Sequence, residues 1–217
     1  MIQNYDALTV GKFEALQRAL REHDADINRR NLAVLAILTD KSEDELLDLP
    51  VPKFRALMDK ASFLRRPLRP AAVRKTYTLG DMTLRPVADI QKMTTAQYID
   101  FQTLAEQPEE PTAQLVSCFL IPEGHRYSTD YDMAEVHRVI RDFLPIAEAR
   151  GLLAFFFETS RRSMLRTLYS SAATLKRTAR KNKARRKEMA TARLNLELSI
   201  LTLRGTVGRP TFGPLLK

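Results

Sequence analysis

The feature that most constrains this chain is a stretch of 53 residues, 152–204, that contains neither glycine nor proline. These two residues interrupt helices more strongly than any others, glycine through its backbone freedom and proline through its missing N–H. Apolar residues recur in the stretch at intervals of three and four, which is the spacing of one helix face. They include Leu165, Leu168, Ala172, Leu175 and Ala179. We therefore predict a long helix over residues 159–204, either intact or broken once where Asn182 and Arg186 interrupt the pattern.

Charge divides the chain into two parts. Residues 1–158 hold 20 Lys and Arg against 24 Asp and Glu, for a net charge of −4. Residues 159–217, which we call the basic arm, hold 15 Lys and Arg against two acidic residues, for a net charge of +13. The sequence thus predicts a mildly acidic body and a basic arm that perform different physical tasks.

The densest charge in the basic arm is a run over residues 176–187, with eight basic residues in twelve and no acidic one. Such a run can neutralise the phosphates of a nucleic acid and release counterions, complement an acidic protein surface, or remain solvated. No aromatic residue occurs from 170 to 211, which disfavours base stacking, and the face opposite the bases is mostly Ala and Thr, which disfavours a membrane surface. The candidate contact residues are Lys176, Arg177, Arg180, Lys181, Lys183, Arg185, Arg186 and Lys187.

The C-terminal end, residues 205–217, differs from the predicted helix before it. It holds three of the seven glycines of the chain and two prolines, so we expect an extended strap here. Phe212, Leu215 and Leu216 are the candidate apolar anchors of this strap.

Residues 1–64 carry the pattern of a small helical bundle. Thr9 stands before one helical segment as a capping residue, and Ser42 with Glu45 has the spacing of a capping box before another. Apolar residues then recur at helical spacing. The predicted segments are residues 10–22, residues 31–40, a short segment between Ser42 and Pro50, and residues 51–64.

Residues 65–75 contain two prolines and several basic residues, which is typical of a linker, and residues 76–158 are expected to form a helical core. Near the start of this core, alternating apolar residues on both sides of Gly80 and Asp81 indicate a short β-hairpin. The signal is weak because the turn order is Gly-Asp rather than Asp-Gly. The expected fold class is mainly α, with room for this hairpin, a long basic helix and the extended strap.

Further segments of the core carry local signals. Thr94 or Thr95 is expected to cap a helix, and Asp132 with Glu135 repeats the capping pattern before another. The apolar run at residues 112–121 suits a buried helix, and its length also suits a buried strand, so both remain open.

The residue types that usually carry catalysis or bind metals do not form a recognisable motif. His23, His125 and His137 lack metal-ligand partners at motif spacing, and a polar helix face or a turn accounts for them. Cys118, the single cysteine, stands in the apolar run, so we expect a buried, unreactive thiol and no internal disulfide. Hydrolase, nucleotide-binding and zinc-protease motifs are missing as well. We therefore expect no enzyme activity, no cofactor and no small-molecule substrate.

The expected compartment follows from two absences in the sequence. No run of 18 apolar residues occurs, and the N-terminal residues lack the basic-then-apolar order of a secretory signal. We expect a soluble protein of a reducing, cytoplasmic compartment with no membrane partner.

Three stretches of the chain share a distinctive combination of apolar and turn residues. They are MTTAQYIDFQTLAEQ at residues 93–107, SCFLIPEGHRYSTDYD at 117–132 and LLAFFFETSRR at 152–162. Together they resemble a loosely defined group of tailed-bacteriophage proteins from gut Bacteroidetes phages, encoded among virion structure genes and often likened to tail-assembly chaperones. The resemblance covers roughly residues 75–165 and brings no catalytic residues with it.

The resemblance implies a place in a phage particle. Other virion proteins would be the partners, with multiple copies in a ring or complex, and DNA is a further candidate. The basic arm lies mostly outside the resemblance, and a soluble chaperone needs no such arm. We therefore expect a non-enzymatic structural subunit of the head–tail or tail region, found in the virion after assembly in the host cytoplasm. A nucleic-acid-binding virion or cargo protein and a transient tail-assembly chaperone are the alternatives.

Overall fold

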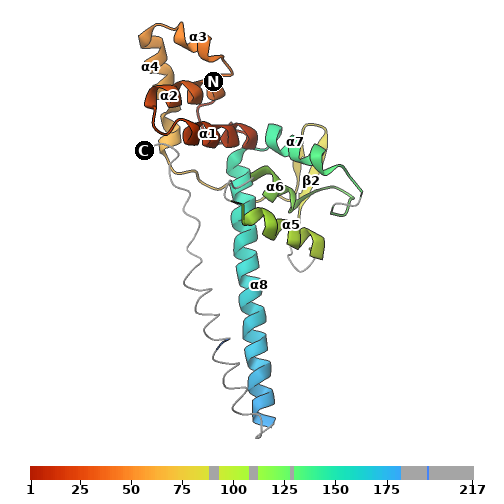
Figure 1. Ribbon diagram of the computed structural model, residues 1–217. Coiled ribbons are helices and arrows are strands. Elements are labelled where there is room, and N and C mark those ends of the chain that lie inside the picture. Colours follow the sequence, from red (N-terminus) through yellow and green to blue (C-terminus); the bar gives the residue numbers. More distant parts are fainter. Residues whose placement is uncertain (88–92, 108–111, 128–129, 182–194, 196–217) are drawn as a thin grey trace. The chain divides into compact units, whose positions relative to one another are not determined.

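The described part of the chain is mainly α-helical, with a small sheet of three strands, as the sequence predicts (Figure 1). Residues Met1–Leu153 belong to one compact unit, and a second unit begins at Ala154. The computed structural model describes residues 1–87, 93–107, 112–127, 130–181 and 195.

Helices make up most of the first 65 residues. They are α1 (Val10–Glu22), α2 (Ile27–Thr39), α3 (Glu43–Leu47), α4 (Val51–Lys60) and the 3₁₀-helix η1 (Ala61–Arg65). α1 begins after Thr9, whose hydroxyl accepts the backbone N–H of Lys12 at 3.5 Å. α3 begins with the capping box of Ser42 and Glu45. Both predicted helix starts are confirmed.

Two boundaries in this region differ from the prediction. α2 begins at Ile27, earlier than predicted, because the Asp26 carboxylate accepts two backbone N–H groups of the first turn. The helix predicted over residues 51–64 ends at Lys60 and continues as η1. η1 buries three side chains whereas α4 buries none, so the tighter helix is the part that reaches the core.

Three longer helices follow later in the chain. They are α5 (Thr95–Ala105), α7 (Met133–Phe143) and α8 (Ile146–Lys181). Thr94 caps α5, since its hydroxyl accepts the N–H of Gln97, and Asp132 caps α7 as predicted. α8 begins before residue 159, where the long helix was predicted to start, and its described part ends at Lys181. Apart from Asn195, the remainder of the predicted helix lies outside the described residues.

The small sheet is antiparallel, in the order β1 (Tyr77–Leu79), β2 (Met82–Pro86) and β3 (Leu120–Pro122). β1 and β2 form the predicted hairpin, with Gly80 and Asp81 as the two turn residues. The φ angle of Gly80 is 58°, and a type II′ turn places glycine at this first central position. The Gly-Asp order therefore suits this turn, whereas Asp-Gly would suit type I′.

The apolar run at residues 112–121 contains both of the structures that its sequence leaves open. α6 (Thr112–Ser117) occupies the first part, and β3 begins at Leu120. The run is short, and its apolar residues fit both a helix and a strand, so their spacing does not mark where the helix ends. Tertiary partners mark it instead, because α6 packs against α7 while β3 pairs with β2.

In the first unit, α1 connects the N-terminal helices to the rest, since it contacts α2, α6 and α7 (Figure 1). Two backbone hydrogen bonds fasten its start. The Val10 N–H donates to Leu144 O at 3.0 Å, and the Ile146 N–H donates to Leu8 O at 2.8 Å. All four residues are fully buried. One core thus contains helices from both predicted parts of the body, and the domain boundaries inside the body stay predictions.

The segment predicted as a linker, residues 65–75, is bound to the start of α8. The Ala71 N–H donates to Ala147 O at 2.8 Å. A Cβ atom on Gly151 would lie 2.1 Å from Ala71 O, so only glycine permits this close approach.

Candidate functional site

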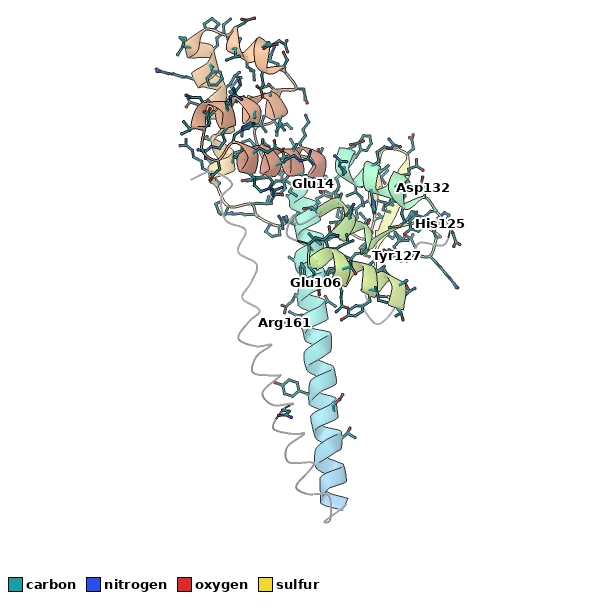
Figure 2. All side chains as sticks on the ribbon, viewed as in Figure 1. Glu14, Glu106, His125, Tyr127, Asp132 and Arg161 are labelled. Carbon is teal, nitrogen blue, oxygen red and sulfur yellow. The ribbon has the colours of Figure 1, made fainter. Side chains whose placement is uncertain are left out.

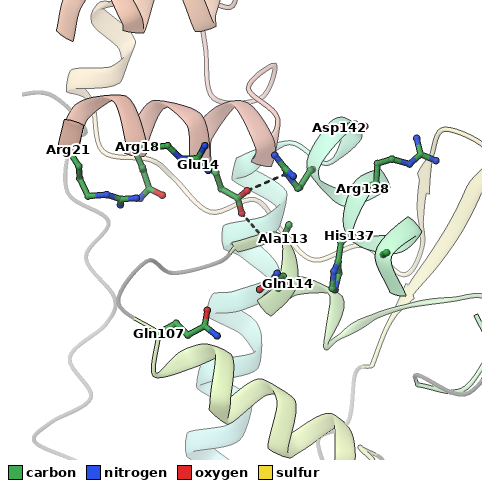
Figure 3. A pocket seen from close by; sticks show the side chains of 12 residues that line it. Glu14, Arg18, Arg21, Gln107, Ala113, Gln114, His137, Arg138 and Asp142 are labelled. Atoms are coloured by element: carbon green, nitrogen blue, oxygen red, sulfur yellow. Dashed lines mark hydrogen bonds and ion pairs between the residues drawn. The ribbon is translucent and has the colours of Figure 1, made fainter. Parts of the chain in front are cut away.

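Helices α1, α6 and α7 line an open pocket of about 520 Å³ in the first unit (Figure 3). Its lining is polar almost throughout and includes four arginines and two carboxylates. The lining residues are Glu14, Gln17, Arg18 and Arg21 of α1, Gln107, Ala113 and Gln114, and Ala134, His137, Arg138, Arg141 and Asp142 of α7.

The two long helices present these side chains because both are amphipathic. α1 buries one face through Val10, Phe13, Leu16 and Ala19, and its pocket residues occupy another face at intervals of three and four. α7 buries Val136, Val139 and Ile140 and presents its own polar face in the same way. The pocket therefore forms where two polar helix faces meet α6.

Glu14 links the three helices that form the pocket. Its Oε1 accepts the backbone N–H of Ala113 at 3.0 Å, and its Oε2 lies 3.6 Å from Nε of Arg141 (Figure 3). Arg141 is more than half exposed, so this ion pair contributes less than about 1 kcal/mol. The hydrogen bond to Ala113 satisfies a backbone donor in the first turn of α6.

The remaining arginines of the pocket differ in their partners. Arg138 forms an ion pair with Glu135 at 3.5 Å, and Figure 3 shows its side chain turned away from α1. Arg18 and Arg21 are exposed and form no ion pair with any residue that the structure describes. In Figure 3 both extend from α1 on the side where Gln107 lies. The pocket therefore holds two guanidinium groups without a carboxylate partner among the described residues.

Of the three histidines, which the sequence assigned to a helix face or a turn, His137 lines the pocket. It is half-buried, and this burial lowers the pKa of its imidazole, while the nearby Asp132 carboxylate acts in the opposite direction. His23 follows the last turn of α1, and His125 lies in the segment between β3 and α7 (Figure 2). The described residues contain no group of three metal-ligating side chains.

Cys118 is fully buried, which confirms the predicted burial. Burial raises the pKa of its thiol to about 11, so the thiolate is scarce at neutral pH. Its sulfur lies 3.7 Å from the Tyr127 hydroxyl, which donates a hydrogen bond to Oδ2 of Asp100 at 2.9 Å (Figure 2). This arrangement fits a polar contact inside the core better than a nucleophile.

The basic arm is described in part. Lys176, Arg177, Arg180 and Lys181 lie on the backbone of α8, while the other four predicted contact residues lie outside the described residues. The predicted strap anchors Phe212, Leu215 and Leu216 also lie outside them.

The first two cations of the basic arm share one carboxylate. Nη2 of Arg161 and Nε of Arg162 lie 3.0 Å and 2.8 Å from Oε1 of Glu158. Their hydrogen bonds hold the pKa of Glu158 below its usual value. The pairs join residues three and four positions apart, which is the ordinary spacing of ion pairs on one helix face.

Sequence reasoning found the basic arm but missed the pocket. The signal was present, since α1 carries Arg18 and Arg21 three residues apart, and α7 carries His137, Arg138 and Arg141. This signal could not be interpreted from the sequence, because the pocket depends on the contact between α1 and α7. These two helices are more than a hundred residues apart in the chain.

No helix in the described part of the chain combines the length and the apolarity needed to span a membrane. Searches of family models, curated proteins and solved structures find no match to this chain.

Proposed function

We propose that this protein is a non-enzymatic structural subunit of a phage particle, in the head–tail or tail region. Its body would pack among neighbouring virion proteins, and its basic arm would bind an acidic surface on one of them. The observation that carries the binding role is the separation of charge between the body, at −4, and the basic arm, at +13. The phage assignment rests on the three stretches that resemble phage proteins.

The charge balance supports a partner for the basic arm. Its 15 basic residues have only Glu188 and Glu197 as acidic residues of the same segment, and Glu158 just before it serves Arg161 and Arg162. Closely spaced like charges oppose helix formation and compaction. An external polyanion would relieve this repulsion, and an acidic protein surface supplies it without requiring aromatic side chains.

Mass spectrometry of purified virions tests the structural role. A structural subunit is expected in mature particles at a fixed ratio to the other virion proteins. A transient chaperone would be absent from mature particles, and that absence would contradict the proposal.

A charge-matched pair of variants tests the basic arm. In the first, all eight basic residues of the 176–187 run are replaced by Gln, and in the second, each Lys is exchanged for Arg and each Arg for Lys. We expect the Gln variant to be lost from assembled particles and the exchanged variant to be retained. Equal incorporation of both would show that the run does not bind a partner.

Nucleic-acid binding is the second candidate, favoured by the density of eight basic residues in twelve. Neutralising about six phosphates predicts a log–log slope of affinity against salt of roughly −5. Fluorescence anisotropy with a labelled duplex would measure this slope. Duplex affinity that is unchanged in the Gln variant would exclude this candidate.

A further inference from the structure

We propose that the pocket between α1, α6 and α7 binds a compact phosphate anion, of the pyrophosphate class, through Arg18 and Arg21. The pocket lies in the first unit, and the inference is independent of the role assigned to the basic arm. It rests on the geometry of α1, the partners of Glu14 and the chemistry of the lining.

The pairing of Glu14 leaves Arg18 without its usual helix partner. Glu14 and Arg18 are four residues apart on α1, with the acid toward the N-terminus, which is the favourable order for an ion pair along a helix. Both carboxylate oxygens of Glu14 are instead engaged, one by the N–H of Ala113 and the other by Arg141. The fold thus diverts the carboxylate, and the Arg18 guanidinium, without an ion pair to any described residue, is available to a ligand.

Arg21 adds a second guanidinium on the same face. Residues three apart on a helix are neighbours, so Arg18 and Arg21 start from adjacent positions on one face of α1. Each guanidinium presents a planar fork of donors that matches two oxygens of a phosphate. Two such forks suit an anion that carries at least two negative charges.

The charge of the pocket agrees with such a ligand. Among the described residues, four arginines and two carboxylates line it, and burial favours the neutral form of His137, so these side chains carry a net charge of +2. Three glutamines also line the pocket: Gln17 of α1, Gln107 just after α5, and Gln114 of α6. Their amide N–H groups can donate hydrogen bonds to further phosphate oxygens.

The shape and composition of the pocket define the class of phosphate. Its volume of about 520 Å³ lies within the range of small-molecule sites. His137 is the one aromatic ring among the lining residues, and the apolar lining consists of two alanines. The pocket therefore offers little surface on which a nucleobase could stack, which favours the phosphate groups alone.

Isothermal titration calorimetry with pyrophosphate tests the proposal on the full chain. The basic arm could also bind this anion, so the parent is the full-length variant in which the eight basic residues of 176–187 are Gln. We expect the parent to bind pyrophosphate, and R18Q/R21Q to weaken this binding at least about tenfold, equivalent to about 1.4 kcal/mol. The matched control is R55Q, which removes an exposed arginine of α4 that does not line the pocket and should change the affinity less than about twofold.

Three results would overturn the proposal. They are the absence of binding by the parent up to about 10 mM pyrophosphate, equal affinity of the parent and R18Q/R21Q, and equally tight binding of succinate, which carries two charges without phosphate oxygens.

Because Arg18 and Arg21 are exposed, both substitutions should leave the thermal unfolding midpoint unchanged. R18K/R21K retains the charge and the helix propensity but loses the donor forks, so it should fold normally and bind severalfold more weakly. Affinity in R18K/R21K equal to that of the parent would also contradict the role of the forks.

Discussion

The body and the basic arm place their charged groups by different means. In the body, ion pairs join distant parts of the sequence, as between Glu14 and Arg141 or between Arg74 and Glu148. In the described part of the basic arm, Arg161 and Arg162 take their carboxylate from the preceding turn of the same helix. The body thus combines tertiary ion pairs with local pairs such as Arg138 and Glu135, whereas the described ion pairs of the arm all lie within one helix. A region that depends on periodicity alone needs its own acidic residues, and the arm has two.

The largest expected effect concerns the close packing of the body. Gly151→Ala places a Cβ atom 2.1 Å from Ala71 O, and we expect a loss of about 3 kcal/mol or more in the free energy of unfolding, measured by urea denaturation. The same change at an open helix position would instead stabilise by up to about 1 kcal/mol. The sign of the change therefore separates tertiary packing from helix propensity.

Gly11→Ala provides the graded control for this substitution. Its added Cβ would lie 3.0 Å from Arg141 O, so a loss of about 1 kcal/mol is expected. If Gly151→Ala is as stable as the wild-type protein, the segment around Ala71 does not pack against α8 as described.

A smaller effect is expected at Glu14. Glu14→Ala removes the acceptor of the Ala113 N–H and the partner of Arg141, and should reduce the free energy of unfolding by about 1–2 kcal/mol. Asp142→Ala is the matched control, because Asp142 lines the same pocket without an ion pair among the described residues, and it should change stability by less than about 0.5 kcal/mol. Equal losses in the two variants would argue that Glu14 does not connect the helices.

The pH dependence of the body should contain a contribution from His137. Burial lowers its pKa in the folded state, so the unfolded state binds more protons near and below the ordinary value of 6.5. This contribution to stability is present above pH 6.5 and is lost as the pH falls through the folded-state pKa. Denaturation at a series of pH values should show a shallower acid loss for His137→Asn than for the wild-type protein, and identical profiles would contradict this role.

The smallest effect is expected in the basic arm. Salt screens like-charge repulsion, so raising the ionic strength should increase the helix signal in circular dichroism, by an amount equivalent to a few tenths of a kcal/mol per repulsive pair. The variant with the eight basic residues of 176–187 replaced by Gln should lose this response. A salt response of the same size in both chains would assign it to the body.

Features that depend on neighbouring residues could be predicted from the sequence. Thr9, Ser42 and either Thr94 or Thr95 were expected to cap helices, and Thr9, Ser42 and Thr94 each accept a backbone N–H of the following turn. The hairpin at Gly80 was also predicted, although the reason that its Gly-Asp order works became clear only from the φ angle of Gly80. The start of α2 was missed because Asp26 lies in a polar segment that was interpreted as a turn, and a carboxylate there can also cap a helix.

The sequence by itself determined the mainly α fold, most of the helix starts and the unequal distribution of charge. These properties follow from local backbone preferences, from the spacing of apolar residues and from composition. Only the tertiary structure decided where the run at residues 112–121 changes from helix to strand, and that Glu14 binds Ala113 and Arg141 rather than Arg18. Both outcomes depend on contacts between residues far apart in the chain, and no local pattern specifies which of several compatible partners the fold will bring within reach.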